Sequence, residues 1–282
     1  MEVLCDERNG YGEGFFIVTH AEKQGLTKHL HARHSLSGIF MRFFGGAAAT
    51  EERENSKKMN GILSRYGYEG YFGKEGTTEF VGRVVTAYMG QARVATDEGE
   101  IECTYAPAIG APGHEDGVCV GDWVRLEPIP GGVRVAEILP RKTVLTRRAA
   151  GPVDMEQRIA ANIDRFVIVS SLNADFNVSR IERYLAALLP GGAEPFIVLS
   201  KADLVPEPEE YLSRVREIAN GASVLCVSAQ TGEGMDELRA ALENRTCALI
   251  GMSGVGKSSI VNFLSGGTKM KVGGIREDDS RG

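Results

Sequence analysis

The chain has 282 residues, of which 43% are hydrophobic and 25% are charged, and its formal net charge is −6. This is the composition of a soluble globular protein with room for two cores, and it excludes a protein coated in basic surface. The five cysteines form no C-x-x-C pair, which excludes a zinc knuckle and suits a reducing compartment. No apolar stretch approaches the roughly 18 residues needed to cross a bilayer, and the N-terminus is acidic where a secretory signal is basic. We therefore expect a cytoplasmic protein without membrane contact.

Residues 1–58 show no sustained hydrophobic period and end in a charged run at 51–58, which is typical of a solvated linker. Four of the five histidines lie in this part, but no cysteine or paired carboxylate joins them at metal-ligand spacing. These histidines are His20, His29, His31 and His34. We expect a poorly ordered leader over 1–58 rather than a metal site, followed by a short lead-in segment over 59–79.

Residues 80–148 contain short strand-like segments separated by turns. The segments either are rich in β-branched and aromatic residues or alternate polar and apolar residues, as half-buried strands do. They lie at 80–88, 91–96, 100–105, 121–126 and 132–139. This pattern predicts a small closed barrel of the OB type over 80–148.

From residue 149 to 282 the pattern changes to strand, helix, strand. The continuous apolar run at 166–170 is typical of a fully buried parallel strand, and further strands are predicted at 195–199 and 223–227. Between them, apolar residues recur at the spacing of one helix face. The alternation predicts a parallel sheet with helices on both faces.

Two short segments at the ends of predicted strands indicate which base the protein reads. Ser200-Lys201-Ala202-Asp203 resembles the [N/T]-K-x-D motif, whose carboxylate accepts hydrogen bonds from N1–H and N2–H₂ of guanine. Adenine lacks both donors and would leave the carboxylate unpaired. Ser228-Ala229 resembles the companion S-A motif. Serine stands at position 200 where asparagine is usual, and because its hydroxyl makes only part of the bridge to the phosphate loop, we expect weaker guanine affinity.

Residues 251–258 read G-M-S-G-V-G-K-S and fit the phosphate-binding pattern G-x-x-x-x-G-K-[ST] at every fixed position. An apolar run precedes them and a helix-forming run follows, which is the context that the motif requires. Lys257 is predicted to reach the β- and γ-phosphates as the catalytic residue, and Ser258 is predicted to hold Mg²⁺. The predicted GTP-binding residues are Ser200, Lys201, Ala202, Asp203, Ser228, Ala229, Gly251, Met252, Ser253, Gly254, Val255, Gly256, Lys257, Ser258 and Ser259.

The base-reading segments precede the phosphate loop, whereas in most GTPases they follow it. This order indicates a circular permutation, which costs little when the natural termini are close together. A small all-β OB-type barrel followed by a circularly permuted α/β P-loop GTPase domain closely resembles the small-ribosomal-subunit biogenesis GTPase family, the RsgA or YjeQ type. The resemblance covers residues from about 62 to 282, and further matching motifs lie at 139–148, 160–164, 175–177 and 181–184.

The resemblance implies a protein that binds GTP with Mg²⁺ and hydrolyses it slowly to GDP and phosphate. It also implies stimulation by the 30S ribosomal subunit during late maturation, contact of the barrel with 16S rRNA, and action as a monomer. In this sequence the one local basic cluster of the barrel region consists of Arg141, Lys142, Arg147 and Arg148. These residues are candidates for RNA contact, or else the solvated start of the linker between the domains.

Three parts of the family pattern are absent from this chain: a switch-I threonine, a strand with D-x-P-G, and a final zinc-binding Cys/His domain. We therefore expect a truncated version of a longer gene product, in which the missing strand leaves the sheet with an unpaired edge. No residue can be assigned to position the hydrolytic water.

Two other functions remain open from the sequence. A P-loop ATPase or kinase-like enzyme that does not read guanine is suggested by Ser200. A non-catalytic RNA-binding module with an inert, incomplete nucleotide domain is suggested by the missing motifs.

Overall fold

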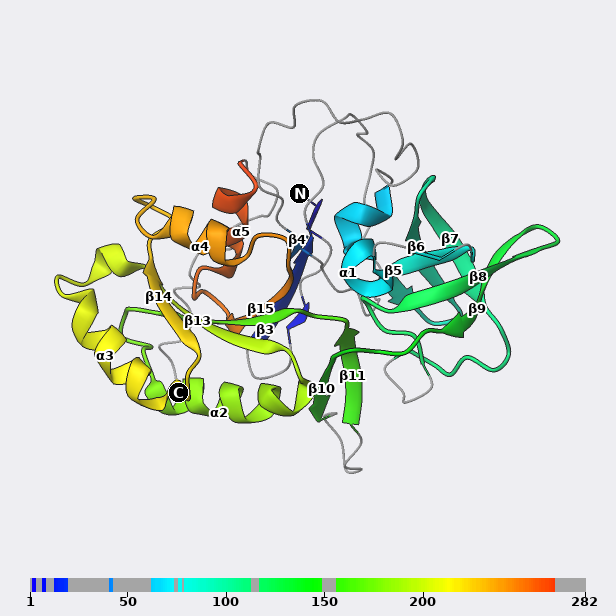
Figure 1. Ribbon diagram of the computed structural model, residues 1–282. Helices are drawn as coiled ribbons and strands as arrows, with labels where there is room; N and C mark the ends of the chain where they lie inside the picture. The colour runs from blue at the N-terminus through cyan, green and yellow to red at the C-terminus, as the bar shows by residue number, and fades with distance from the viewer. Residues whose placement is uncertain are drawn as a thin grey trace, which may run out of the picture.

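A computed structural model describes residues 62–266 apart from 74–75, 78, 113–116 and 149–155, together with four strand segments nearer the N-terminus. Two architectures stand side by side: a closed barrel and a helix-covered sheet, with a two-stranded hairpin between them (Figure 1). The circularly permuted α/β domain and the preceding OB-type barrel are therefore confirmed. Of the described helices, none is long and apolar enough to span a bilayer.

The barrel consists of five strands, of which the first is buried along nearly its whole length. They are β5 (Val81–Tyr88), β6 (Gln91–Thr96), β7 (Gly99–Tyr105), β8 (Trp123–Ile129) and β9 (Gly132–Ile138). The order β5-β6-β7-β9-β8 closes when β8 pairs with β5, and the β7–β9 pair is parallel. Val84, Val94, Val124 and Val135 fill the interior and are fully buried.

The lead-in segment packs aromatic side chains against barrel strands β5, β6 and β8. It contains a 3₁₀-helix, Ile62–Tyr66, and the short helix α1, Tyr68–Phe72. The rings of Tyr71 and Phe72 lie 5.5 Å and 5.2 Å from that of Trp123, which is 1% exposed. Tyr71 and Trp123 of this cluster also line a cavity shared with Thr246 of the second domain.

The second domain is built on four parallel strands in the spatial order β15-β12-β13-β14. Their bounds are β12 (Arg165–Ser171), β13 (Glu194–Ser200), β14 (Ser223–Val227) and β15 (Thr246–Met252). The helices are α2 (Val178–Leu188), α3 (Pro208–Ile218), α4 (Met235–Ala241) and α5 (Lys257–Leu264), with 3₁₀ turns at Leu189–Gly191 and Ala202–Leu204. Helices α2 and α3 lie on one face of the sheet, and α4 and α5 lie on the other (Figure 1). The predicted strands at 166–170, 195–199 and 223–227 are all present; the first two are largely buried, whereas β14 is mostly half-buried.

Local signals account for where two of these helices begin. Asn177 precedes α2, and its side-chain Oδ1 accepts a hydrogen bond from the backbone N–H of Arg180 at 3.1 Å. Helix α3 begins with Pro208, whose missing N–H would have no partner within the helix, and acidic residues follow in its first turn.

A separate hairpin connects the two domains. Strand β10 (Val144–Arg148) pairs antiparallel with β11 (Glu156–Ala161) and belongs to neither the barrel nor the main sheet. The barrel strands therefore end at Ile138, before the domain boundary that the sequence suggested near 148. The boundaries 80–148 and 149–282 stay predictions as limits of independently folding units.

The N-terminal strands correct one expectation. They are β1 (Glu2–Val3), β2 (Glu7–Arg8), β3 (Glu13–Thr19) and β4 (Met41–Arg42). Strand β3 pairs antiparallel with β15 along its whole length, from Cys247 opposite Val18 to Met252 opposite Glu13. The expectation of an unpaired edge beside the phosphate-loop strand is therefore wrong, because a segment rich in strand-forming residues satisfies that edge. The four histidines of the leader and residues 267–282 lie outside the described residues.

Candidate functional site

Three loops meet beyond the carboxyl ends of β13, β14 and β15. Because parallel strands present their carboxyl ends at the same edge of a sheet, this edge is where α/β proteins bind ligands. A cavity of about 310 Å³ lies there, and residues from all three loops line it. The lining residues are Ser200, Lys201, Asp203, Leu204, Ala229, Gln230, Gly256, Ser259 and Ile260. The segments that the sequence assigned to the base and to the phosphates therefore share one cavity.

Three of these lining residues were not predicted. Leu204 follows Asp203 directly, Gln230 follows Ala229 directly, and Ile260 lies one turn into α5. Their positions next to the motifs were the available signal. The predicted residue Ala202 is buried beneath the cavity instead of lining it.

Asp203 is held in place by the serine of the companion motif. The Ser228 hydroxyl donates a hydrogen bond to Oδ1 of Asp203 at 2.5 Å. The same hydroxyl oxygen accepts the backbone N–H groups of Gln230 and Thr231 at 3.2 Å and 3.1 Å. Ser228 is fully buried, so its contribution is to orient the carboxylate from below. The preceding Lys201 adopts a left-handed backbone with φ 58°, a conformation that costs a non-glycine residue about 1–3 kcal/mol and is concentrated at functional sites.

The phosphate loop needs its glycines for two separate reasons. Gly254 and Gly256 have φ angles of 80° and 95°, in the region that favours glycine. A Cβ atom on Gly251 would lie 2.3 Å from the carbonyl oxygen of Val169 in β12, so the two backbones meet closely there. A Cβ atom on Gly256 would lie 3.7 Å from the hydroxyl of Ser200, which shows how near the base side is to the phosphate side.

Lys257 spans this loop from its position at the start of α5. Its ammonium donates hydrogen bonds to the carbonyl oxygens of Gly251 and Met252, both at 2.7 Å, and the residue is 4% exposed. A charge held in this way is prearranged for a phosphate group, and the N-terminus of α5 adds favourable partial charge. Met252, Ser253, Gly254, Val255 and Ser258 lie along the same loop and helix start, outside the lining of the base-side cavity.

Ser200 joins the two halves of the site. Its side chain is almost completely buried, and its hydroxyl donates a hydrogen bond to the carbonyl oxygen of Val255 at 2.5 Å. The hydroxyl thus makes one link from the base-reading loop to the phosphate loop.

We expect Ser200→Ala to weaken nucleotide binding about tenfold, because it leaves the Val255 carbonyl without this partner and loosens the loop. Titration calorimetry with GDP measures the effect. Ser213→Ala is a matched control, because Ser213 is exposed on α3 and its hydroxyl bonds only within that helix, to the Glu209 carbonyl at 3.0 Å. Equal GDP affinity for both variants would contradict the assigned link.

Gly251→Ala is expected to destabilise the protein by about 1–3 kcal/mol, because the new Cβ pushes β15 away from the Val169 backbone. Urea unfolding followed by circular dichroism measures the change. Gly132→Ala is the control, since a Cβ at Gly132 in β9 meets nothing within 4 Å. A Gly251 variant as stable as the Gly132 variant would show that the close approach to β12 relaxes without cost.

The candidate RNA-contacting residues have different surroundings. Arg141 forms a bidentate ion pair with the buried carboxylate of Asp122, at 2.7 Å and 2.8 Å. Burial alone lowers the pKa of Arg141, but the hydrogen bond to Asp122 and nearby negative charge outweigh it and raise the pKa above its ordinary value. Lys142 is exposed and donates to the carbonyl oxygen of Gly70 at 2.7 Å. The side chains of Arg147 and Arg148 lie outside the described residues, so RNA contact by this cluster stays a prediction.

Two other kinds of chemistry find no support in the described part of the chain. No group of three or more histidine, cysteine, aspartate or glutamate side chains there is arranged to hold a metal ion. Burial raises the pKa of Cys103 and of Cys226 to about 11, which leaves both thiols protonated and poorly nucleophilic near neutral pH.

Comparison with known proteins agrees with a nucleotide-binding site at this position. The family described as RsgA GTPase matches residues 138–282. A small ribosomal subunit biogenesis GTPase RsgA of Streptomyces coelicolor is 40% identical over 206 residues, which is 71% of this chain and 56% of that protein. The protein of the same name in Xanthomonas campestris pv. campestris is 46% identical over 173 residues, which is 61% of this chain and 46% of that protein. The chain thus spans about half the length of the curated relatives it matches.

A solved structure supports the fold in the same way. The crystal structure of YjeQ from Thermotoga maritima superposes with a TM-score of 0.53 at 26% sequence identity, covering 69% of this chain and 68% of that one. The motifs, the order in which they occur, the shared cavity and the match over 138–282 lead to one conclusion: the chain belongs to the RsgA GTPase family.

Proposed function

We propose that this protein binds guanine nucleotides in the cavity between β13, β14 and β15 and hydrolyses GTP to GDP and phosphate. The observation that carries the proposal is that one cavity of about 310 Å³ is lined both by Asp203 and Ala229 and by Gly256 and Ser259. A base-reading carboxylate and a phosphate-binding loop thus belong to one ligand site.

The chemistry of the lining selects guanine over adenine. The Asp203 carboxylate, oriented by Ser228, accepts hydrogen bonds from the N1–H and N2–H₂ donors of guanine. Adenine offers neither donor, and it would bury the carboxylate without partners. The aliphatic part of Lys201 lies at the same cavity and suits stacking on a flat base.

The residues present also fit a magnesium ion that arrives with the nucleotide. Mg²⁺ prefers oxygen ligands and takes few from protein when phosphates supply the others. Ser258, at the second position of α5, offers a hydroxyl next to Lys257, and this set needs no carboxylate cluster. When bound, the ion would neutralise phosphate charge. The chain's own contribution to phosphoryl transfer is the positioning of the phosphates by the loop and the positive charge of Lys257.

A competition assay tests the nucleotide assignment. A fluorescent GTP analogue bound to the protein should be displaced by GTP and GDP at concentrations at least a hundredfold lower than by ATP. Equal displacement by ATP and GTP would favour the P-loop ATPase reading and overturn the guanine assignment.

We further propose that the protein acts in the cytoplasm, as a monomer, in late maturation of the small ribosomal subunit, with the barrel in contact with 16S rRNA. The names of the relatives in Streptomyces and Xanthomonas support this role. On the barrel surface, Arg93, Arg125 and Arg134 each lie within ion-pair distance of a glutamate. RNA phosphates would therefore have to replace these internal partners or bind at the basic cluster near Arg147 and Arg148.

Turnover of GTP measured with and without 30S subunits tests this second part. We expect the subunits to increase the rate, and the effect to fall steeply as salt is raised, because phosphate contacts release counterions. Nucleotide binding without turnover in either condition would favour the inert RNA-binding module instead. Turnover that 30S subunits leave unchanged would contradict the ribosomal role while leaving the GTPase assignment intact.

A further inference from the structure

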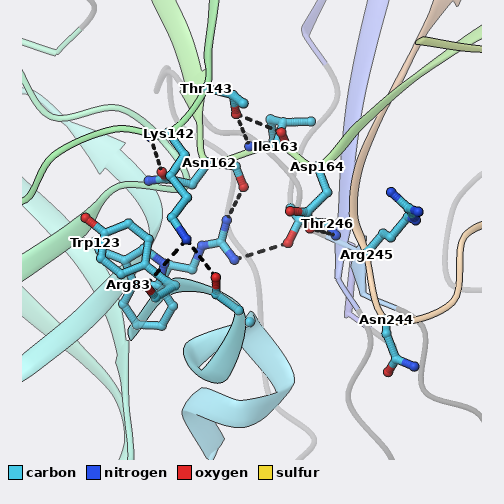
Figure 2. A pocket seen from close by; sticks show the side chains of 13 residues that line it. Arg83, Trp123, Lys142, Thr143, Asn162, Ile163, Asp164, Asn244, Arg245 and Thr246 are labelled. Atoms are coloured by element: carbon cyan, nitrogen blue, oxygen red, sulfur yellow. Dashed lines mark hydrogen bonds between the residues drawn. The ribbon is translucent and has the colours of Figure 1, made fainter. Parts of the chain in front are cut away.

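Arg83 is a buried arginine whose guanidinium contacts both domains at once. It lies in the barrel strand β5 and is 2% exposed. Within the barrel half, its Nη1 donates to the Tyr66 carbonyl and its Nε donates to the Gly121 carbonyl at 3.3 Å. Across the junction, its Nη2 donates to the Asn162 carbonyl at 2.7 Å and its Nη1 donates to the Thr246 hydroxyl at 3.2 Å. Figure 2 shows the guanidinium reaching the two acceptors across the junction, Asn162 and Thr246.

The acceptor on the nucleotide side is the first residue of β15, the strand that ends in the phosphate loop. Thr246 is itself fixed by Asp164, whose carboxylate Oδ2 accepts the Thr246 N–H at 2.6 Å. The Asp164 N–H in turn donates to the Thr246 carbonyl at 2.8 Å. The guanidinium of Arg83 therefore contacts the first residue of a strand held in place by hydrogen bonds, not a surface loop.

The second acceptor across the junction is equally well fixed. Asn162 has a left-handed backbone with φ 55°, and its N–H donates to the Thr143 carbonyl at 2.9 Å. Its side-chain Nδ2 donates to the Gly121 carbonyl at 3.0 Å, so Arg83 and Asn162 converge on the same barrel turn. Arg83 of the barrel thus donates across the junction to Asn162, and Asn162 donates back to Gly121 of the barrel.

Arginine is the side chain that this position requires. A guanidinium carries five donors in a planar fork, whereas a lysine ammonium is a compact point that cannot reach acceptors on opposite sides. The Arg83 guanidinium also lies 5.4 Å from the ring of Trp123, which supports it from the barrel side. Beside it, a cavity of about 300 Å³ lies between the domains, lined by Arg83, Lys142, Asp164 and Arg245 among others. Close apolar packing therefore does not fill this part of the junction, and hydrogen bonds hold it together.

We propose that Arg83 is a positioning residue that joins the barrel to the phosphate-loop strand, so that the two domains unfold together and respond together to nucleotide. A buried guanidinium is stable only when its donors are satisfied. Two acceptors of Arg83 lie on the barrel side, one lies at Asn162 directly after the hairpin strand β11, and one lies at Thr246 in the phosphate-loop strand. Separating the domains would expose or orphan the guanidinium and its acceptors. The free energy lost with these hydrogen bonds therefore couples the unfolding of the two domains.

The chain provides its own reporter for this coupling. It has one tryptophan, Trp123, buried in the barrel, so its fluorescence reports unfolding of the barrel. Far-ultraviolet circular dichroism is dominated by α2 to α5, which belong to the nucleotide domain. In urea the two probes should give coincident transitions for the original protein and separate transitions for Arg83→Met.

Arg93→Met is the matched control. Arg93 is also a barrel arginine, but its ion-pair partners Glu100 and Glu102 lie in the neighbouring barrel strand. In Arg93→Met the urea transitions followed by Trp123 fluorescence and by circular dichroism should remain coincident. Coincident transitions in Arg83→Met as well, with midpoints like those of the control, would overturn the proposal.

A second variant covers the case in which Arg83→Met does not fold. Thr246→Val keeps the β-branched shape that suits β15 and removes only the hydroxyl acceptor. We expect a smaller separation of the two transitions in this variant, in the same direction. Coincident transitions in Thr246→Val, when Arg83→Met cannot be refolded, would also count against the coupling.

A nucleotide arm separates positioning from simple stabilisation. GDP with Mg²⁺ should raise the urea midpoint of the Trp123 transition in the original protein and in Arg93→Met, although it binds in the other domain. In Arg83→Met the shift of that transition should fall by at least half while GDP affinity, titrated directly, stays within twofold. A full shift in Arg83→Met would overturn the proposal. Absence of GDP binding to the original protein would overturn the proposed function, and the coincidence of the urea transitions would still decide the coupling.

Discussion

Replacing Lys257 with alanine is expected to abolish GTP binding, with a loss of at least about 100-fold, and to leave the fold intact. The ammonium group lies across the phosphate loop on the carbonyl oxygens of Gly251 and Met252, and we expect it to contact the phosphates of a bound triphosphate. Charge-assisted hydrogen bonds to phosphate contribute about 1.5–3 kcal/mol each, so the loss of two such bonds gives this factor. Because the residue sits at the start of α5, the truncation removes no apolar core side chain.

Titration with a fluorescent GTP analogue, with circular dichroism as the check of folding, measures this effect. Lys142→Ala is the control, because Lys142 contacts Gly70 at the domain junction and does not line the base-side cavity. GDP should lose less affinity than GTP in the Lys257 variant, since it lacks the γ-phosphate. A folded Lys257 variant with unchanged GTP affinity would remove the residue from the site.

Asp203→Asn is expected to lower GTP affinity by at least about 100-fold and to remove the preference for GTP over ATP. In the proposed site the carboxylate accepts two hydrogen bonds from guanine, whereas an amide would present one acceptor and one donor group to the same edge. One guanine donor then faces an amide N–H₂, which leaves a buried polar group without a partner. Xanthine carries an oxygen where guanine carries its amino group, so the variant should bind the xanthine nucleotide better than the original protein does.

Competition of GTP, ATP and xanthosine triphosphate against one fluorescent nucleotide measures all three affinities. Asp236→Asn is a suitable control, because Asp236 is exposed in the first turn of α4 and lies outside the cavity. Ser228→Ala should cost less, about tenfold, since it frees the Asp203 carboxylate to rotate but keeps both oxygens. Retained guanine preference in Asp203→Asn would show that the base is read elsewhere.

The sequence predicted most of the site because its signals are local. A phosphate loop is a contiguous run with fixed glycines, and Gly254 and Gly256 have the positive φ angles that such a run needs. Alternating and continuous apolar runs likewise report the burial of each strand, so the barrel and the parallel sheet were both predicted correctly. The shared cavity agrees with the resemblance of two separate segments to motifs that act on one nucleotide.

The parts that were missed depend on residues far apart in the chain. Nothing local to Arg83 indicates that its guanidinium reaches Thr246, because a buried polar side chain in a barrel strand has no characteristic period. The pairing of β3 with β15 is similar, since it joins the two ends of the described chain. Ser200 lies between these cases: its link to the phosphate loop was expected in part, while the exact acceptor, the Val255 carbonyl, required coordinates.

The position of β15 has a consequence for how the protein is made. This strand comes after β12, β13 and β14 in the chain, yet it lies between β3 and β12 in the sheet. On a translating ribosome the loops assigned to guanine are synthesised before the phosphate loop. The position between β3 and β12 has to stay unfilled until β15 emerges and inserts there. Nascent chains that stop before Thr246 should therefore be unable to retain nucleotide, and insertion of this interior strand, with its distant partners, is the step we expect to limit the rate of folding.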